Sequence, residues 1–209
     1  MSSQLASRTP DEDEVFDDHL PARMQVKSSV HFTPVSVARQ AARLLAPLPG
    51  MRVLDVGAGP GKFCIVAAFE VPGSTFVGVD LRPHLVRVAR RLATRMAVTN
   101  VMFLDGDALE LDWSEYDAFY LYNPFGEQLV GNALALDSKL ERLPSRFRHY
   151  VRATRERLAR ARIGTRVVTY HGFGAPAPHG YELVNIHPAA PYRLKLWIKT
   201  RITPKLELA

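Results

Sequence analysis

Short apolar runs alternate along the chain with longer stretches in which apolar residues recur every three or four positions. The short runs indicate buried strands, and the longer stretches indicate helices with one face turned towards a core. The first four predicted strands run into acidic or amide residues at or near their ends, and they cover residues 53–56, 75–80, 101–107 and 116–125. The predicted helices begin at Pro34, Phe63, Pro83 and Ser145 and extend to about residues 45, 71, 96 and 162.

The last third of the chain has a different pattern. Three more strands are predicted at residues 166–172, 181–187 and 192–201, with no long helix after the first of them. The loop between the second and third is too short for a parallel crossover, so these two strands should form an antiparallel hairpin. The alternation of strands and helices before them predicts a parallel sheet covered on both faces. The predicted fold is therefore α/β, a doubly wound, mostly parallel seven-stranded sheet with a C-terminal antiparallel hairpin.

The N-terminal segment is polar and acidic. Residues 1–18 offer almost nothing to bury and are predicted to form a disordered acidic tail, whereas residues 19–209 are predicted to form a single domain. Thr33 is the predicted N-cap of the first helix, with Pro34 at its first helical position. Residues 127–144 show no regular pattern and are left as an irregular segment.

The net charge of +6 is unevenly distributed along the chain. Residues 1–18 hold six of the 21 acids and one of the 27 bases, so the remainder carries 26 bases against 15 acids, a net charge of +11. Such an arginine-rich surface makes nucleic acid or another anion a possible partner, although it also serves solubility. No apolar run approaches the roughly 18 residues that span a bilayer, so no membrane partner is expected. With one cysteine and a polar start, a cytoplasmic location is expected.

A glycine-rich turn follows the first strand. Residues 52–62 read RVLDVGAGPGK, in which Gly57, Gly59 and Gly61 alternate. Glycine lets the backbone come close to a ligand, and the start of the next helix supplies free amides, so the turn predicts a site for a nucleotide-like cofactor. The spacing G-x-G-x-G differs from the G-x-G-x-x-G of nicotinamide and flavin enzymes. A nicotinamide enzyme is the second interpretation that this fold allows.

Four motifs in this order resemble those of the class I S-adenosylmethionine-dependent methyltransferases. VLDVGAGPG is similar to the first motif of that family, VGVDLRP to the second, FLDGDA to the third and YNPF to the fourth. The resemblance covers residues 31–201. It implies the class I methyltransferase fold, methyl transfer as the activity and S-adenosyl-L-methionine as the cofactor.

The resemblance also implies roles for the acids at the strand ends. Asp55 looks like the acid that orders the glycine turn and reaches the amino group of the cofactor. Asp80 looks like the carboxylate that accepts both ribose hydroxyls. Asp107 resembles the acid that accepts from the adenine amino group, with Asp105 competing for that role, and each aspartate taken alone could equally be a turn or helix cap. The other expected cofactor contacts are Phe32, Thr33, Gly57, Ala58, Gly59, Gly61, Leu81, Ala108 and Asn123.

Asn123, Pro124 and Phe125 resemble the N-P-P-Y/F motif of amino-group methyltransferases, with one proline instead of two. In that motif the asparagine oxygen and the proline carbonyl accept hydrogens from the target nitrogen, and the ring packs on a planar substrate. The three residues are therefore the predicted catalytic residues, acting on an amine of a protein or a small molecule. Nucleic-acid N-methylation is one alternative, and a non-catalytic module that binds S-adenosylmethionine is another.

Other candidates have two interpretations each. The sequence HFTP at residues 31–34 resembles the segment that amino-group DNA methyltransferases place over the methionine end of the cofactor, or it is a helix cap with a hydrophobic staple. Tyr120 and Tyr122 could face the sulfonium or simply fill a buried strand. Cys64 is expected to be a small core residue, and His171 is a candidate for removing a proton. His31, His179 and His187 form no recognisable metal-ligand spacing, so no metal is expected.

Overall fold

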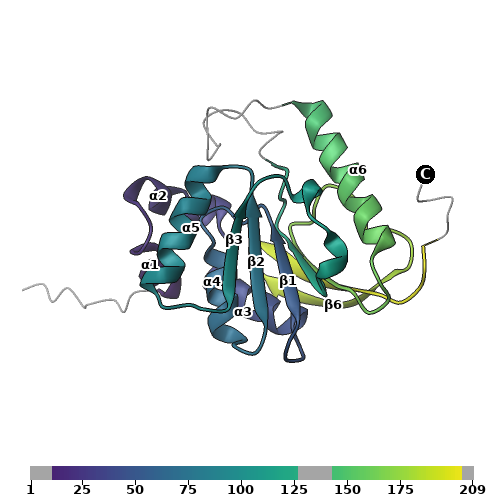
Figure 1. Cartoon of the computed structure of the whole chain (residues 1–209), viewed down its shortest axis with the longest axis horizontal. Coiled ribbons are helices and arrows are strands. Elements are labelled where there is room, and N and C mark those ends of the chain that lie inside the picture. The colour runs from purple at the N-terminus through teal and green to yellow at the C-terminus, as the bar shows by residue number, and fades with distance from the viewer. Residues whose placement is uncertain (1–10, 127–142, 204–209) are drawn as a thin grey trace, which may run out of the picture.

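The computed structural model describes residues 11–126 and 143–203, and within them a single seven-stranded sheet has the order β3-β2-β1-β4-β5-β7-β6. The neighbours from β3 to β5 are parallel, whereas β7 runs antiparallel to both β5 and β6. The predicted sheet and its antiparallel hairpin are thus confirmed (Figure 1). The strands are β1 (Arg52–Val56), β2 (Thr75–Asp80), β3 (Val101–Asp105), β4 (Ala118–Leu121), β5 (Arg166–Tyr170), β6 (Tyr181–Ala189) and β7 (Tyr192–Lys199).

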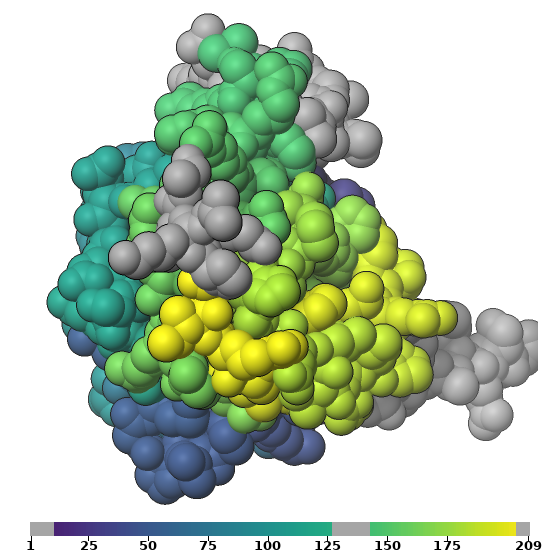
Figure 2. All heavy atoms as spheres, turned by 90° about the vertical axis from the view of Figure 1, so that its right-hand side faces the viewer, coloured from purple at the N-terminus to yellow at the C-terminus, as the bar shows by residue number. Residues whose placement is uncertain are grey.

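Helices cover both faces of the sheet. On one face lie α3 (Val35–Leu45), α4 (Lys62–Glu70) and α5 (Pro83–Arg95), which share one hydrophobic cluster with the sheet. On the other face lie α6 (Pro144–Arg160) and two short 3-10 helices, η1 (Ala108–Glu110) and η2 (Trp113–Glu115), around a second cluster (Figure 1). The centre of the side shown in Figure 2 is formed by α6 and the C-terminal strands. Among the described residues, no helix is long and apolar enough to cross a membrane.

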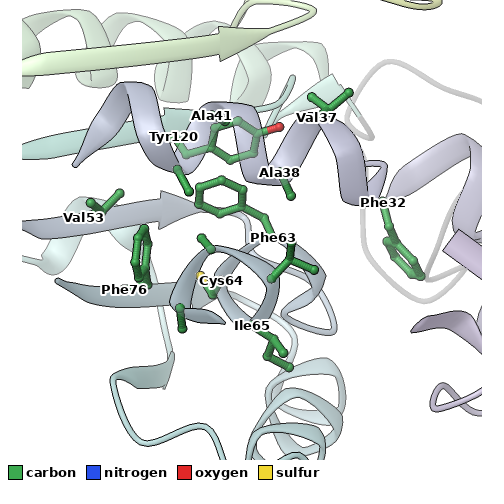
Figure 3. Close-up of a cluster of buried hydrophobic side chains, with 14 of the residues drawn as sticks. Phe32, Val37, Ala38, Ala41, Val53, Phe63, Cys64, Ile65, Phe76 and Tyr120 are labelled. Atoms are coloured by element: carbon green, nitrogen blue, oxygen red, sulfur yellow. The ribbon is translucent and has the colours of Figure 1, made fainter. Parts of the chain in front are cut away.

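The core beneath the glycine turn is built from rings and small side chains. Phe63 of α4 stacks on Tyr120 of β4 with ring centroids 3.8 Å apart and planes 11° from parallel (Figure 3). Cys64 beside it is fully buried, as expected of a small core residue. Because α4 is buried on nearly all sides, its start is held rigidly at the carboxyl end of β1. The turn that precedes α4 is therefore fixed by packing on both sides.

The N-terminal segment differs from the predicted disordered tail. Residues 12–17 form α1 (Glu12–Asp17), which begins with a capping box made by Asp11 and Glu14, and Phe16 is buried. A second helix, α2 (Ala22–His31), was not predicted. The physical reason is that the acids of α1 meet Lys62, a partner far along the chain that sequence periodicity does not reveal. Residues 1–10 lie outside the described part of the chain.

The start of α3 also differs from the prediction. Pro34 occupies the N-cap position without a side-chain cap, and the free amide of Val35 donates to Asp13 Oδ1 of α1 at 2.9 Å. Thr33 is not the cap, because its hydroxyl bonds to the Tyr120 hydroxyl at 3.0 Å. The Asp13 carboxylate of α1 therefore caps α3, which is the role that the sequence predicted for Thr33. Of the irregular segment predicted at residues 127–144, positions 127–142 lie outside the described part of the chain.

Candidate functional site

The carboxyl ends of the parallel strands meet at one edge of the sheet, where two recesses adjoin. One is lined by Val56, Gly57, Val79, Asp80, Leu81, Arg82, Gly106, Asp107, Ala108, Pro124, Phe125 and Tyr150. The other is lined by His31, Phe32, Thr33, Asp55, Val56, Gly57, Ala58, Gly59, Lys62, Phe63, Arg82, Tyr120 and Tyr122. The two share Val56, Gly57 and Arg82, so together they form a continuous track across the ends of β2, β1 and β4.

The glycine turn lies at the centre of this track. Gly57 has φ +82°, and the Cβ of any larger residue there would lie 3.4 Å from Pro124 Cβ and 3.5 Å from the Pro124 carbonyl oxygen. Gly61 has φ +84°, and a Cβ there would clash with Phe103 at 2.5 Å. Gly61 lines neither recess, so its role is in packing the start of α4 against β3. Ala58 and Gly59 line the second recess, as expected of backbone that contacts a ligand.

Asp80 ties the glycine turn to the end of β2. Its side chain is nearly inaccessible, and its Oδ2 accepts from the Gly59 amide at 2.8 Å. Arg82 supplies its backbone amide at 2.9 Å and its guanidinium at 2.8 Å to the same carboxylate. The carboxylate thus accepts from the glycine turn and from Arg82, and its role towards ribose hydroxyls stays a prediction. The sequence analysis did not identify Arg82 as a partner of Asp80. Its position two residues after this strand-end acid could have indicated the contact.

Asp55, at the carboxyl half of β1, lies under the second recess. Burial raises the pKa of its carboxyl to about 8, with the charge of Asp80 adding to the effect, while the bond from Cys64 Sγ at 3.5 Å acts in the opposite direction. The pKa of Cys64 is also raised, first by burial and then by the charge of Asp55. Asp55 is therefore mostly protonated at neutral pH unless a cation binds beside it.

Asp107 lies in the first recess, and Asp105 does not. Asp107 Oδ1 accepts from the Leu109 amide at 2.8 Å, which caps η1, and its Oδ2 accepts from the Tyr150 hydroxyl. Asp105 is half exposed and pairs with Arg90 at 3.2 Å. The geometry thus favours Asp107 over Asp105 as a ligand contact. Ala108 and Leu81 line the same recess.

Tyr150, a residue of α6 that sequence reasoning placed only in the helix core, completes the wall of the first recess. Its ring centroid lies 5.1 Å from that of Phe125. Burial first, and then its bond to Asp107, raise the pKa of Tyr150 to about 12. The hydroxyl therefore remains a hydrogen-bond donor to Asp107 at all physiological pH values. The amphipathic pattern of α6 gave no sign of this contact.

Asn123, Pro124 and Phe125 form a turn directly after β4. Asn123 has φ +38°, unusual for a residue with a side chain, and its amide donates to the Gly172 carbonyl at 2.9 Å. Its side chain lies against Gly126, where an added Cβ would meet Asn123 Nδ2 at 2.2 Å, and Asn123 lines neither recess. Pro124 and Phe125 do line the first recess. The structure thus brings two of the three predicted catalytic residues to the track and turns the asparagine side chain aside.

The segment before α3 covers the second recess. Phe32 Cε1 lies 3.9 Å from the position a Cβ would take on Gly59, and Thr33 is tied to Tyr120 behind it. Tyr122 also lines this recess, and its hydroxyl donates to the Val30 carbonyl at 3.3 Å. Phe32 and Thr33 therefore lie where the sequence analysis expected them, over the glycine turn. Among the residues of ranges 11–126 and 143–203, no group of three metal-ligating side chains comes together.

Lys62 is the main residue of the second recess that sequence reasoning missed. It follows Gly61 directly and is 2% exposed, yet its Nζ lies 2.7 Å from Asp13 Oδ1 and 2.8 Å from Asp17 Oδ1. Ser28 Oγ lies at 3.2 Å, and the Phe16 ring centroid at 5.3 Å. A lysine at the start of a mostly apolar helix was the available signal, because a buried ammonium needs partners. Through Lys62, α1 and α2 are fastened to the glycine turn.

Comparisons with known proteins match this chain to methyltransferases. A family model described as a methyltransferase domain matches residues 47–129. The release factor glutamine methyltransferase of Vibrio cholerae is 41% identical over 54 residues, covering 26% of this chain and 19% of that protein. Its counterpart in Escherichia coli is 32% identical over 92 residues, covering 44% and 32%. The matched part of this chain thus spans about a fifth to a third of the length of these two relatives.

Solved structures match over most of the chain. An RNA methyltransferase from Salinibacter ruber in complex with S-adenosyl-L-homocysteine is 25% identical, with a TM-score of 0.57 over 83% of this chain and 96% of that one. TrmN from Thermus thermophilus is 26% identical, with a TM-score of 0.60 over 83% and 52%. By its sheet and by these matches, the chain has the fold of the class I S-adenosylmethionine-dependent methyltransferases and contains a methyltransferase domain.

Proposed function

We propose that the protein transfers the methyl group of S-adenosylmethionine to a nitrogen atom of a protein or a small molecule. The observation that carries this proposal is the continuous track across the strand ends, which has an acid at each position where the cofactor needs an acceptor. The first recess would take the adenine and the second the methionine end. When bound, the cofactor supplies a methyl group already activated by its sulfonium.

The residues of the track fit that cofactor. Asp80 would accept the ribose hydroxyls in place of the Arg82 guanidinium, and Asp107 would accept from the adenine amino group. Asp55 would face the cationic amino group of the methionine end, which favours its ionised form. Each of these groups is fixed by backbone or side-chain bonds before any ligand arrives, so little ordering remains to be done on binding.

The choice of nitrogen rests on the turn after β4. The Pro124 carbonyl oxygen lies beside Gly57, close to the middle of the track, where it would accept a hydrogen from the target amine. Phe125, in the wall of the first recess, fixes the position of this turn. Asn123 would add the second acceptor after a rotation of its side chain away from Gly126. Positioning of this kind can account for much of the rate gain in an in-line displacement.

A nucleic-acid acceptor is a second candidate, favoured by one surface. Arg148, Arg152 and Arg155 are exposed on α6, spaced so that they share one side of the helix. This helix also supplies Tyr150 to the track. One structural neighbour is an RNA methyltransferase. Binding to RNA through these arginines would weaken steeply with added salt, because each phosphate contact releases counterions.

Two measurements test the proposed function. Calorimetry with S-adenosylhomocysteine should give saturable binding, and Asn123→Ala should leave that affinity within about twofold while turnover falls at least about tenfold. Labelled S-adenosylmethionine incubated with cell extract, fractionated into protein, metabolites and nucleic acid, identifies the acceptor. Absence of saturable binding would refute the cofactor assignment. Loss of cofactor binding in Asn123→Ala would refute its role on the acceptor side, and label confined to nucleic acid would select the second candidate.

A further inference from the structure

Four rings gather beside the turn that follows β4. Tyr170 and Tyr192 lie with ring centroids 5.2 Å apart, Tyr122 and Tyr170 at 4.8 Å, and His171 and Tyr192 at 4.2 Å. The topology explains why they meet. Tyr122 follows β4, while Tyr170 and His171 lie at the end of β5, and β7 runs antiparallel to β5, so Tyr192 begins β7 at the same edge of the sheet. The rings thus gather where the parallel strands end.

The ring group is connected to the reacting end of the track by two contacts. The Asn123 amide donates to the carbonyl of Gly172, the residue after His171, at 2.9 Å. Tyr122, which precedes Asn123, lines the second recess. Asn123 and His171 both have positive φ, +38° and +65°, a backbone state that residues with side chains adopt rarely and that concentrates at functional sites. The turn after β4 and the turn after β5 therefore form one structural unit.

Two of the rings form the base of this unit and two form its surface. Tyr170 is 1% exposed, and its hydroxyl donates to the Ala190 carbonyl at 3.0 Å. Tyr122 is half-buried and donates to Val30. Tyr192 is 36% exposed and His171 is exposed as well, and their planes are 40° apart. Because the inner rings are anchored by hydrogen bonds, the outer rings have a firm support for a ligand that stacks on them.

We propose that His171 and Tyr192 form an acceptor platform that binds a planar heteroaromatic ring and presents its amino group to the turn at Asn123 and Pro124. This inference rests on the proposed function and names its substrate class. A flat ring gains from stacking on aromatic faces, whereas an aliphatic lysine or glutamine side chain does not gain in the same way. The acceptor is thus a ring amine, either in a free nucleoside-sized molecule or in an unpaired base of a single strand.

The chemistry balances without any further reactant. The lone pair of the ring amino nitrogen forms the new carbon–nitrogen bond, and the carbon–sulfur bond breaks with its electron pair passing to the sulfonium sulfur. One hydrogen of the amino group, held by the Pro124 carbonyl, leaves as a proton to solvent. The platform acts before this step by holding the nitrogen in line with the methyl group. His171 and Tyr192 are therefore positioning residues and take no part in bond exchange.

The test uses the full chain with Tyr192→Leu and Tyr192→Phe, in assays of methyl transfer to adenosine, cytidine, a mixed-sequence single-stranded RNA and a glutamine-containing peptide. Tyr192→Leu should raise the KM for the accepted ring compound about tenfold, the loss expected for one stacked ring. Its kcat should fall less, and its affinity for S-adenosylhomocysteine should stay within about twofold. Tyr192→Phe, which keeps the ring, should retain the wild-type KM and serves as the matched control.

The outcomes separate this inference from the proposed function. Methylation of adenosine or cytidine alone identifies a free ring amine, and methylation of the RNA alone identifies an unpaired base, so both support the platform. Methylation of the peptide alone overturns the platform but leaves methyl transfer to nitrogen standing. An unchanged KM in Tyr192→Leu also overturns the platform. Absence of S-adenosylhomocysteine binding in the wild type overturns the proposed function itself.

Discussion

Lys62 and Asp13 form an ion pair 2.7 Å long that joins the N-terminal helix α1 to the residue directly after the glycine turn. Asp13 uses the same oxygen, Oδ1, to cap α3 through the Val35 amide at 2.9 Å. One carboxylate thus connects the start of α3, the start of α4 and α1. Since Phe32 and Thr33 directly precede α3 and line the second recess, the pair fixes the cover of that recess.

Replacing Lys62 should loosen that cover. Lys62→Met removes the buried cation that pairs with Asp13 and Asp17, so the free energy of unfolding should fall by about 2 kcal/mol. The loss is smaller than for a fully buried ion pair, because both acids are partly exposed. Urea denaturation measures this change. Arg91→Met, at an exposed cation on α5, is the matched control and should change stability by less than about 0.5 kcal/mol. Equal losses in the two variants would contradict the role of Lys62.

Asp80 and Arg82 should respond differently to substitution. Asp80→Asn removes the carboxylate that accepts from the Gly59 amide and that would accept the ribose hydroxyls, so affinity for S-adenosylhomocysteine should fall at least about tenfold. Arg82→Gln should cost less, because the Gly59 amide and the amide of residue 82 still orient the carboxylate. Calorimetry on both variants measures the difference. A larger loss in Arg82→Gln than in Asp80→Asn would mean that the guanidinium itself binds the ligand.

The raised pKa of Asp55 predicts a pH dependence of stability. The pKa of the Asp55 carboxyl is about 8 in the folded protein and 3.8 in the unfolded chain. Folding therefore favours the protonated carboxyl. The protonated carboxyl makes its full contribution to the free energy of unfolding below about pH 4. This contribution decreases by up to about 1.4 kcal/mol per pH unit as the pH rises towards 8. The unfolding free energy of the wild type relative to Asp55→Asn should therefore decline between pH 5 and about 7.5. A difference that is constant with pH would show that Asp55 is ionised in the folded state.

The same shift predicts proton release on cofactor binding. A cationic amino group beside Asp55 favours the carboxylate, so binding of S-adenosylmethionine near pH 7 should release up to about one proton. Calorimetry in two buffers of different ionisation enthalpy measures that number directly. Asp55→Asn should bind without this release. Equal proton release in Asp55→Asn would place the titrating group elsewhere.

Tyr150 should affect binding at the first recess, the proposed adenine site, in two separable ways. Tyr150→Phe removes the bond to Asp107 but keeps the ring against Phe125, so affinity for S-adenosylhomocysteine should change by less than about threefold. Tyr150→Ala also removes the wall of the first recess and should weaken binding about tenfold. Calorimetry on both variants compares the two contributions. Equal effects would mean that the hydroxyl, and not the ring, is the part that matters.

The sheet and most of its elements could be predicted because their causes are local. Apolar runs of fixed length, glycine and proline at the turns, and the short loop before β7 indicate strand, helix and hairpin without any long-range contact. β2 occupies the predicted residues 75–80, and β5 begins at the predicted Arg166. β4 is shorter than predicted, because the chain turns at Tyr122 into the site, and a tyrosine-rich apolar sequence carries no sign of that turn.

What the sequence by itself determined is the order of the elements, the glycine turn and the acids at the strand ends, since each depends on neighbours a few residues away. The tertiary structure alone decided which distant groups meet there. It joined Lys62 to α1, closed the first recess with Tyr150, turned the Asn123 side chain against Gly126 and gathered four rings beside that turn. These contacts depend on the crossing of helices and the register of antiparallel strands, which local periodicity does not encode.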